Sequence, residues 1–173
     1  MKHPLQKMME DRRNGIKAGI PSYCTANPLV LETALRRAKL LGRPVLIEAT
    51  ANQVNQYGGY TGMVPKDFYK MVLEMAEKIG VPENQMILAG DHLGPLTWQN
   101  LPEKEAMDKS IELVYEYARA GFTKIHLDII SGNAGIIGSW LKPGKGRIIP
   151  VCHIGQRITS GLIQAPSARI ADG

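Results

Sequence analysis

Residues 86–92 read M-I-L-A-G-D-H, a short apolar run that ends in an acid and a histidine. Two similar runs, V-L-I-E-A at residues 45–49 and K-I-H-L-D at residues 124–128, also carry a carboxylate near their ends. Short apolar runs of this kind are typical of strands that are buried on both faces, as in parallel sheets. The three runs therefore predict three strands with acids at their carboxyl ends: Glu48, Asp91 and Asp128.

Amphipathic stretches separate these runs and predict helices over residues 28–41, 65–79 and 102–120. Each stretch begins with proline, which suits the first helical position, and each is followed by glycine, which commonly ends a helix. Apolar side chains recur within them at spacings of three and four. With a further short strand at residues 20–25, the order is β-α-β-α-β-α-β, which predicts a parallel α/β sheet.

Two architectures fit this order, an open doubly wound sheet and part of a (β/α)8 TIM barrel. In a barrel the carboxyl ends of the strands form a rim where catalytic groups gather. An open sheet binds ligands at a crevice, usually beside a glycine-rich first turn. The first turn here, T-A-N-P-L at residues 25–29, contains no glycine. We therefore expect a partial (β/α)8 barrel of about four βα units over residues 1–128.

Residues 129–173 form an atypical tail. They hold ten isoleucines and eight glycines, and five basic residues against one acid. Residues 1–128 carry 16 basic and 15 acidic residues, so most of the net charge of +5 lies in the tail and the main body lacks the basic face of a nucleic-acid binder. We expect an irregular segment in which R-I-I-P-V, at residues 147–151, is one of few stretches able to form a strand. The segment is too short for four more βα units, which indicates a truncated or frameshifted sequence.

The tail also fails one test for nucleotide binding. Gly144 and Lys145 resemble the end of a phosphate-binding loop, which requires an earlier glycine and a following serine or threonine. Ser139 occupies the position of the first glycine, and Gly146 follows the lysine. The sequence therefore does not predict ATP binding by this motif.

The cellular compartment is predicted from what the sequence lacks. No apolar run reaches the roughly 18 residues of a membrane span, and the polar amino terminus does not resemble a signal peptide. The two cysteines, Cys24 and Cys152, are too far apart for a zinc-binding spacing or a disulfide framework. We expect a cytoplasmic protein with no membrane partner.

Asp91 and His92 are the sharpest candidates for chemistry. An aspartate can exchange a proton with a substrate oxygen, and a histidine can ligate a divalent metal. Consecutive residues in a strand point to opposite faces, so we expect the strand to end here and both side chains to reach the rim. His126 shares a face with Asp128, and we interpret it as a hydrogen-bonded histidine of the barrel interior. Because a catalytic zinc site needs about three protein ligands, His92 alone predicts an incomplete metal site.

The segment after the second strand, A-N-Q-V-N-Q-Y-G-G-Y-T-G at residues 51–62, is long for a βα loop and rich in amides. Amide side chains can bind hydroxyls or phosphate oxygens, and paired glycines give the backbone freedom to close. An ordinary polar turn with tyrosines packed beneath it fits equally well. The candidate substrate-binding residues are Asn52, Gln53, Asn55, Gln56, Gly58 and Gly59.

Several long runs closely resemble the GatZ/KbaZ family, the Z subunits of D-tagatose-1,6-bisphosphate aldolase. They are N-P-L-V-L-E, L-I-E-A-T-A-N-Q-V-N-Q-Y-G-G-Y-T-G-M, I-L-A-G-D-H-L-G-P, W-Q-N and A-G-F-T-K-I-H-L-D, within residues 14–128. The resemblance implies a barrel related to class II aldolases. It also implies a non-catalytic subunit that stabilises a separate catalytic Y subunit and supports its activity.

The resemblance further implies the reaction and its setting. The complex splits tagatose 1,6-bisphosphate into glycerone phosphate and glyceraldehyde 3-phosphate during galactitol or N-acetylgalactosamine breakdown. Zinc is expected in the catalytic partner and no cofactor in this chain. Asp91 and His92 look like the aldolase Asp-His pair. Val64 departs from the family, which has a helix-capping threonine before Pro65. Some members carry the label tagatose-6-phosphate kinase, which the failed phosphate-loop test does not support.

Three classes of function remain open from the sequence. The first is the non-catalytic aldolase subunit, or a non-functional truncated fragment of one. The second is a stand-alone metal-assisted lyase that uses Glu48, Asp91 and Asp128. The third is a small binding module that acts through its basic tail. Half a barrel would also leave open strand edges and interior residues such as Ile47, Leu88 and Ile125 without partners, so self-association is expected.

Overall fold

The protein is described by a computed structural model that covers residues 3–129 and 149–154. Its strands are β1 (Ser22–Cys24), β2 (Val45–Thr50), β3 (Met86–Leu93), β4 (Lys124–Ile129) and β5 (Ile149–Ile154). Its α-helices are α1 (Pro4–Arg13), α2 (Pro28–Leu41), α3 (Pro65–Ile79) and α4 (Glu103–Ala120). The sequence pattern placed α2, α3 and α4 and the first four strands within a few residues of these bounds, but it did not predict α1. None of the helices in these ranges has the length and apolar character that crossing a membrane requires.

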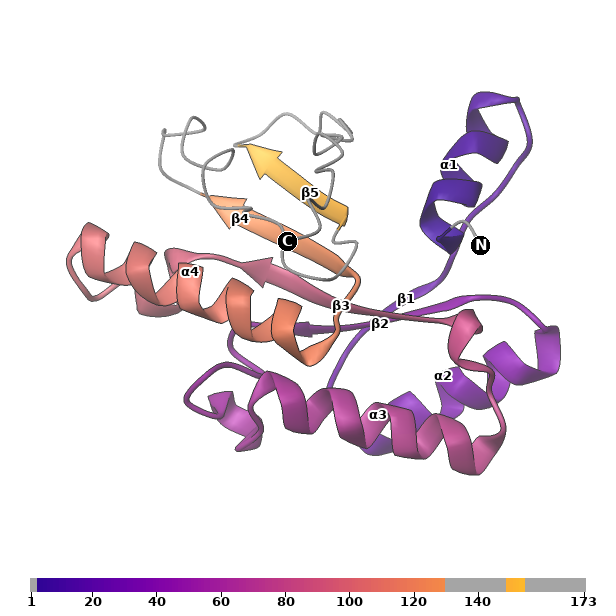
Figure 1. Ribbon diagram of the computed structural model, residues 1–173, viewed down its shortest axis with the longest axis horizontal. Coiled ribbons are helices and arrows are strands. Elements are labelled where there is room, and N and C mark those ends of the chain that lie inside the picture. The colour runs from indigo at the N-terminus through magenta and orange to yellow at the C-terminus, as the bar shows by residue number, and fades with distance from the viewer. Residues whose placement is uncertain (1–2, 130–148, 155–173) are drawn as a thin grey trace, which may run out of the picture.

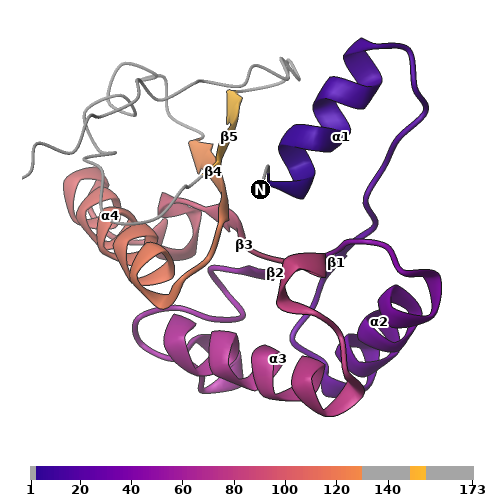
Figure 2. The same ribbon diagram turned by 45° about the vertical axis from the view of Figure 1, so that its right-hand side comes forward.

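The five strands form one parallel sheet in the order in which they occur along the chain. Helices α2, α3 and α4 line one side of the sheet, and α1 lies on the other side (Figure 1). The view in Figure 2 shows the three helices arranged around the outside of the strands. A doubly wound sheet would reverse its strand order and carry crossover helices on both faces. The sequential order and one-sided helices are those of a partial (β/α)8 barrel, as the sequence predicts.

The main hydrophobic core lies between the sheet and helices α2–α4. It contains Ile47, Leu88 and Ile125, whose exposed fractions are 0%, 5% and 0%. The expectation that these three residues face the barrel interior is therefore wrong. Successive strand residues alternate between faces, so the interior side instead carries their neighbours. A second cluster, which includes Leu46 and Ile87, lies there against Leu5 and Ile20.

Strand β5 falls within the segment that we expected to be irregular. It overlaps the R-I-I-P-V stretch and pairs in parallel with β4, with Pro150 opposite Ile125. Proline lacks an N–H group and is tolerated mainly on edge strands. Strand β5 is the last strand of the described sheet, which is consistent with this rule. The other expectations about residues 130–148 and 155–173, including the Gly144-Lys145 motif, lie outside the described residues.

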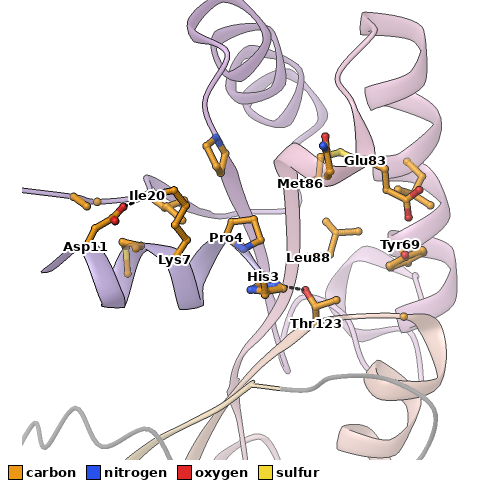
Figure 3. Close-up of a pocket in the computed structure, with 17 residues that line it drawn as sticks. His3, Pro4, Lys7, Asp11, Ile20, Tyr69, Glu83, Met86, Leu88 and Thr123 are labelled. Atoms are coloured by element: carbon orange, nitrogen blue, oxygen red, sulfur yellow. Dashed lines mark hydrogen bonds and ion pairs between the residues drawn. The ribbon is translucent and has the colours of Figure 1, made fainter. Parts of the chain in front are cut away.

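A cavity of about 820 Å³ opens between α1 and the amino-terminal ends of the strands. Figure 3 shows Pro4 and Lys7 of α1 on one side of it and Leu88 of β3 on the other. Across the cavity, the His3 ring nitrogen lies 3.2 Å from the Thr123 hydroxyl oxygen. In (β/α)8 barrels, chemistry gathers at the opposite, carboxyl ends of the strands. The cavity is therefore remote from the predicted catalytic rim.

Helix α3 begins without a side-chain cap. Its N-cap residue is Val64, which makes no capping hydrogen bond, whereas Asn27 caps α2 by accepting from the N–H groups of Leu29 and Val30. We expect Val64→Thr to raise the free energy of unfolding by about 1 kcal/mol, because the hydroxyl supplies the missing acceptor. Urea denaturation measures this change, and Asn27→Ala should produce a loss of similar size. An unchanged midpoint for Val64→Thr would contradict the assignment of this cap.

Candidate functional site

A β-bulge near the carboxyl end of β3 shapes the site. Gly90 pairs with Ile125 and Leu93 pairs with Leu127, so β3 contains one residue more than β4 between the paired positions. His92 lies in this stretch with a φ of 51°, in the left-handed region that non-glycine residues seldom adopt. Such a conformation costs about 1–3 kcal/mol and is concentrated at functional sites. The strand thus continues through the predicted site, and a bulge replaces the expected strand end.

The bulge brings Asp91 and His92 to the same side of the sheet, where they meet His126 of β4. One carboxylate oxygen of Asp91 lies 2.6 Å from His126 Nδ1, and the other lies 2.9 Å from His92 Nδ1. The two imidazole rings lie 4.5 Å apart between centroids. The Cys24 thiol of β1 donates to Asp91 Oδ2 at 3.2 Å. Residues of strands β1, β3 and β4 therefore build one cluster around the Asp91 carboxylate.

The contacts of Asp91 decide its charge. Burial alone would raise the pKa of this carboxyl, but hydrogen bonds from His126, Cys24 and His92 outweigh that effect and hold the pKa well below its usual range. Burial is also the main reason that the pKa of the Cys24 thiol rises to about 12, and the hydrogen bond to Asp91 adds to it. At neutral pH the site therefore holds an ionised carboxylate and a protonated thiol.

We expect Cys24 to react slowly with iodoacetamide, because the thiolate is the reactive form and the raised pKa keeps the thiolate scarce. At pH 8, labelling of the Cys24 peptide should be at least about tenfold slower in the folded chain than in urea. Mass spectrometry of the separated peptides distinguishes Cys24 from Cys152. Equal labelling rates in the folded and unfolded chains would contradict the described environment of the thiol.

Glu48, the second predicted carboxylate, lies one layer farther from the rim. In the sheet register, Glu48 and Lys124 both pair with Ala89, whose small side chain lets the longer ones meet across it. The Lys124 ammonium and the Glu48 carboxylate form a buried ion pair, and the Ser22 hydroxyl donates to the same carboxylate at 2.5 Å. Glu48 is thus held by these partners and is not part of the Asp91 cluster. Neither Lys124 nor Ser22 was among the residues predicted from the sequence.

The third predicted carboxylate, Asp128, occupies a position in β4 that pairs with His153 in β5. Its side chain lies outside what the structure describes, so its predicted role stays a prediction. His126, two residues earlier, is buried and hydrogen-bonded on the interior side, as expected.

The amides of the loop after β2 mainly hold the loop itself together. Asn55 is buried, donates to the Ala51 carbonyl, and accepts from the N–H groups of Tyr57 and Gly59. Gln53 accepts from the N–H group of Thr50 at 2.9 Å. These contacts make the segment a compact, ordered turn.

The remaining loop candidates occupy different positions. Gln56 donates to the Lys109 carbonyl of α4 at 2.9 Å, and Asn52 is exposed. Gly58 and Gly59 both have positive φ angles, of 101° and 54°. Substrate binding by the six predicted loop residues stays a prediction.

The donor atoms of Asp91, His92 and His126 all lie within 4.8 Å of one another. Two imidazoles and a carboxylate are a ligand type found in catalytic zinc sites. Only His92 was predicted as a ligand from the sequence, because His126 was assigned to the barrel interior. The position of His126, two residues before a strand end and on the same face as a rim acid, was the signal that could have identified it as a ligand.

The family model and the curated relatives that match this chain point to the same family. The family described as "D-tagatose-1,6-bisphosphate aldolase subunit GatZ/KbaZ-like" matches residues 5–135, slightly beyond the resemblance seen over residues 14–128. The D-tagatose-1,6-bisphosphate aldolase subunit GatZ of Salmonella newport (strain SL254) is 52% identical over 124 residues, which are 72% of this chain and 29% of that protein. The subunit of the same name from Escherichia coli O139:H28 is 51% identical over 131 residues, 76% of this chain and 31% of that protein.

A solved structure agrees with the fold. The crystal structure of a probable tagatose 6 phosphate kinase from Sinorhizobium meliloti 1021 matches with a TM-score of 0.72 and 42% sequence identity, over 82% of this chain and 40% of that chain. The chain thus spans less than a third of the length of the curated relatives above. From the match over residues 5–135, the chain belongs to the D-tagatose-1,6-bisphosphate aldolase subunit GatZ/KbaZ-like family.

Proposed function

We propose that this chain acts as a non-catalytic subunit that supports the stability and activity of a class II D-tagatose-1,6-bisphosphate aldolase. The observation that carries the proposal is the family match over residues 5–135. The partner is a separate catalytic Y subunit, which holds the zinc of the aldol cleavage. The complex converts tagatose 1,6-bisphosphate into glycerone phosphate and glyceraldehyde 3-phosphate, in the cytoplasm, within galactitol or N-acetylgalactosamine catabolism.

The electrostatics of the Asp91 cluster support a non-catalytic role. A general acid or base is most effective when its pKa lies near the working pH. Three hydrogen bonds hold the pKa of Asp91 well below that range, so the carboxylate is a weak base and rarely carries a proton. Glu48, the other described acid of the sequence prediction, is paired with Lys124. These two acids are therefore better suited to stabilising the rim than to transferring protons.

A second candidate function is a stand-alone metal-assisted lyase. It is favoured by one observation, the grouping of two histidines with Asp91 at the carboxyl edge of the sheet. That edge is where (β/α)8 barrels carry their catalytic groups. The two candidates differ in whether the chain alone turns over substrate.

We expect no measurable cleavage of tagatose 1,6-bisphosphate by the pure chain, with or without added Zn²⁺, because the pKa of Asp91 is held well below the range that proton transfer requires and Glu48 is held in its ion pair with Lys124. A coupled assay for glyceraldehyde 3-phosphate measures the rate. Turnover that disappears in Asp91→Asn would favour the stand-alone lyase and contradict the proposed role. Co-elution with the catalytic subunit on a sizing column, against the catalytic subunit run alone, tests the partnership itself.

A further inference from the structure

We propose that Asp91, His92 and His126 bind one divalent transition-metal ion, with Zn²⁺ as the best fit. This inference goes beyond the supporting role proposed above, in which the only metal belongs to the catalytic partner. It rests on the geometry of the three side chains and does not depend on the activity of the complex.

The distances between the donor atoms suit a small ion. A tetrahedral zinc ion with bonds of about 2.0–2.2 Å keeps its ligand atoms about 3.3–3.6 Å apart. The carboxylate oxygens of Asp91 lie 2.6 Å and 2.9 Å from the Nδ1 atoms of His126 and His92. Each pair must therefore separate by about 1 Å or less, which small side-chain rotations provide. All three donor groups lie within 4.8 Å of one another before any such adjustment.

The local backbone places the ligands in this arrangement. The bulge in β3 turns consecutive residues, Asp91 and His92, toward the same point, and His92 adopts its left-handed conformation there. Glycine or asparagine would occupy that conformation at lower cost. A metal ion bound by the imidazole would explain why a histidine occupies this position.

Burial and outer contacts also fit a metal site. The His126 and Asp91 side chains are 8% and 13% exposed, whereas that of His92 is 56% exposed, so an ion can enter from the rim. The Cys24 thiol donates to Asp91 Oδ2 and fixes the orientation of the carboxylate, as outer-shell partners do in metal sites. Three protein ligands leave a fourth position open for water or an oxygen ligand.

Cobalt provides a direct test, because Co²⁺ replaces Zn²⁺ in such sites and gives visible absorption bands that report its coordination. The full 173-residue chain is titrated with Co²⁺ and then with Zn²⁺ as competitor. We expect one Co²⁺ per chain, with bands that Zn²⁺ abolishes. Loss of an outer-shell partner weakens metal binding 10–100-fold, so removal of a direct ligand in His126→Gln or His92→Gly should weaken it about 100-fold or more.

Two further variants separate metal binding from folding. His92→Gly removes a ligand but also relieves the left-handed strain, so its unfolding temperature should equal or exceed that of the unaltered chain. His3→Gln removes a histidine at the opposite end of the strands and should leave the cobalt spectrum unchanged. The proposal is overturned if the chain binds no stoichiometric Co²⁺, or if binding persists in both His126→Gln and His92→Gly.

Discussion

Replacing Glu48 with glutamine is expected to lower the free energy of unfolding by about 3–5 kcal/mol. The Glu48 and Lys124 side chains are only 8% and 11% exposed, and the substitution leaves a buried ammonium without its counter-charge. A domain is stable by about 5–15 kcal/mol in total, so this single change removes a large share. Urea denaturation at neutral pH, followed by far-UV circular dichroism, measures the loss.

A surface pair and a double variant complete this experiment. Glu32 and Arg36 form an exposed ion pair on α2, and Glu32→Gln should cost less than about 1 kcal/mol. Glu48→Gln combined with Lys124→Met removes both charges and should recover most of the lost stability, because no unpaired charge then remains buried. A loss in Glu48→Gln no larger than that in Glu32→Gln would show that the pair is not buried.

Gly59→Ala is expected to destabilise the chain by about 2–4 kcal/mol, from backbone strain and steric overlap together. Gly59 has a φ of 54°, and an added Cβ would lie 2.4 Å from the Gln53 carbonyl oxygen and 2.8 Å from that of Asn52. Both contacts are with backbone atoms of a hydrogen-bonded turn, which cannot move aside without breaking it. Urea denaturation again measures the change.

Gly62 is a matched control in the same loop. Its φ is 77°, but an added Cβ would have no atom within 4 Å. Gly62→Ala therefore carries the cost of the left-handed backbone alone, about 1–2 kcal/mol. The difference between the two variants isolates the close approach at Gly59. Equal losses of unfolding free energy in Gly59→Ala and Gly62→Ala would mean that the loop is packed less closely than described.

The positions of the helices could be predicted because local sequence signals mark where they end. Gly42, Gly80 and Gly121 each end a helix in the left-handed conformation, and their N–H groups bond to carbonyls of the last turn. Helix α1 was missed because its apolar residues, Leu5, Met8 and Met9, are few and none of them is fully buried. The capping defect at Val64 was predicted from the family resemblance, and the structure confirms that Val64 makes no side-chain cap.

The assignment of strand faces failed for a different reason. Strands buried on both faces carry apolar residues at every position, so hydrophobicity does not distinguish the inside of the barrel from the outside. Glu48 was the signal that could have identified the interior face. An acid near the rim points into the barrel, so Leu46 shares the face of Glu48 and Ile47 lies on the opposite face. Applying the alternation from Glu48 would have placed Ile47 against the helices, where it lies.

The composition of the candidate site was only partly predictable. Asp91 and His92 were identified from their place at a strand end, and both lie in the cluster. The bulge that turns them to one side arises from the pairing of β3 with β4, a tertiary feature with no local motif. His126 was placed on the correct face, but its meeting with Asp91 depends on the same pairing. The sequence therefore indicated the members of the site more readily than their contacts.

The most direct test of the proposed subunit role is the lifetime of the catalytic subunit's activity. Purified Y subunit is incubated with increasing amounts of this chain, and tagatose 1,6-bisphosphate cleavage is followed over time, with an unrelated protein at equal mass as the control. The proposed role predicts that the half-life of the activity increases with the chain and saturates at a fixed ratio of the two subunits. A half-life that equals the control at every ratio would contradict it.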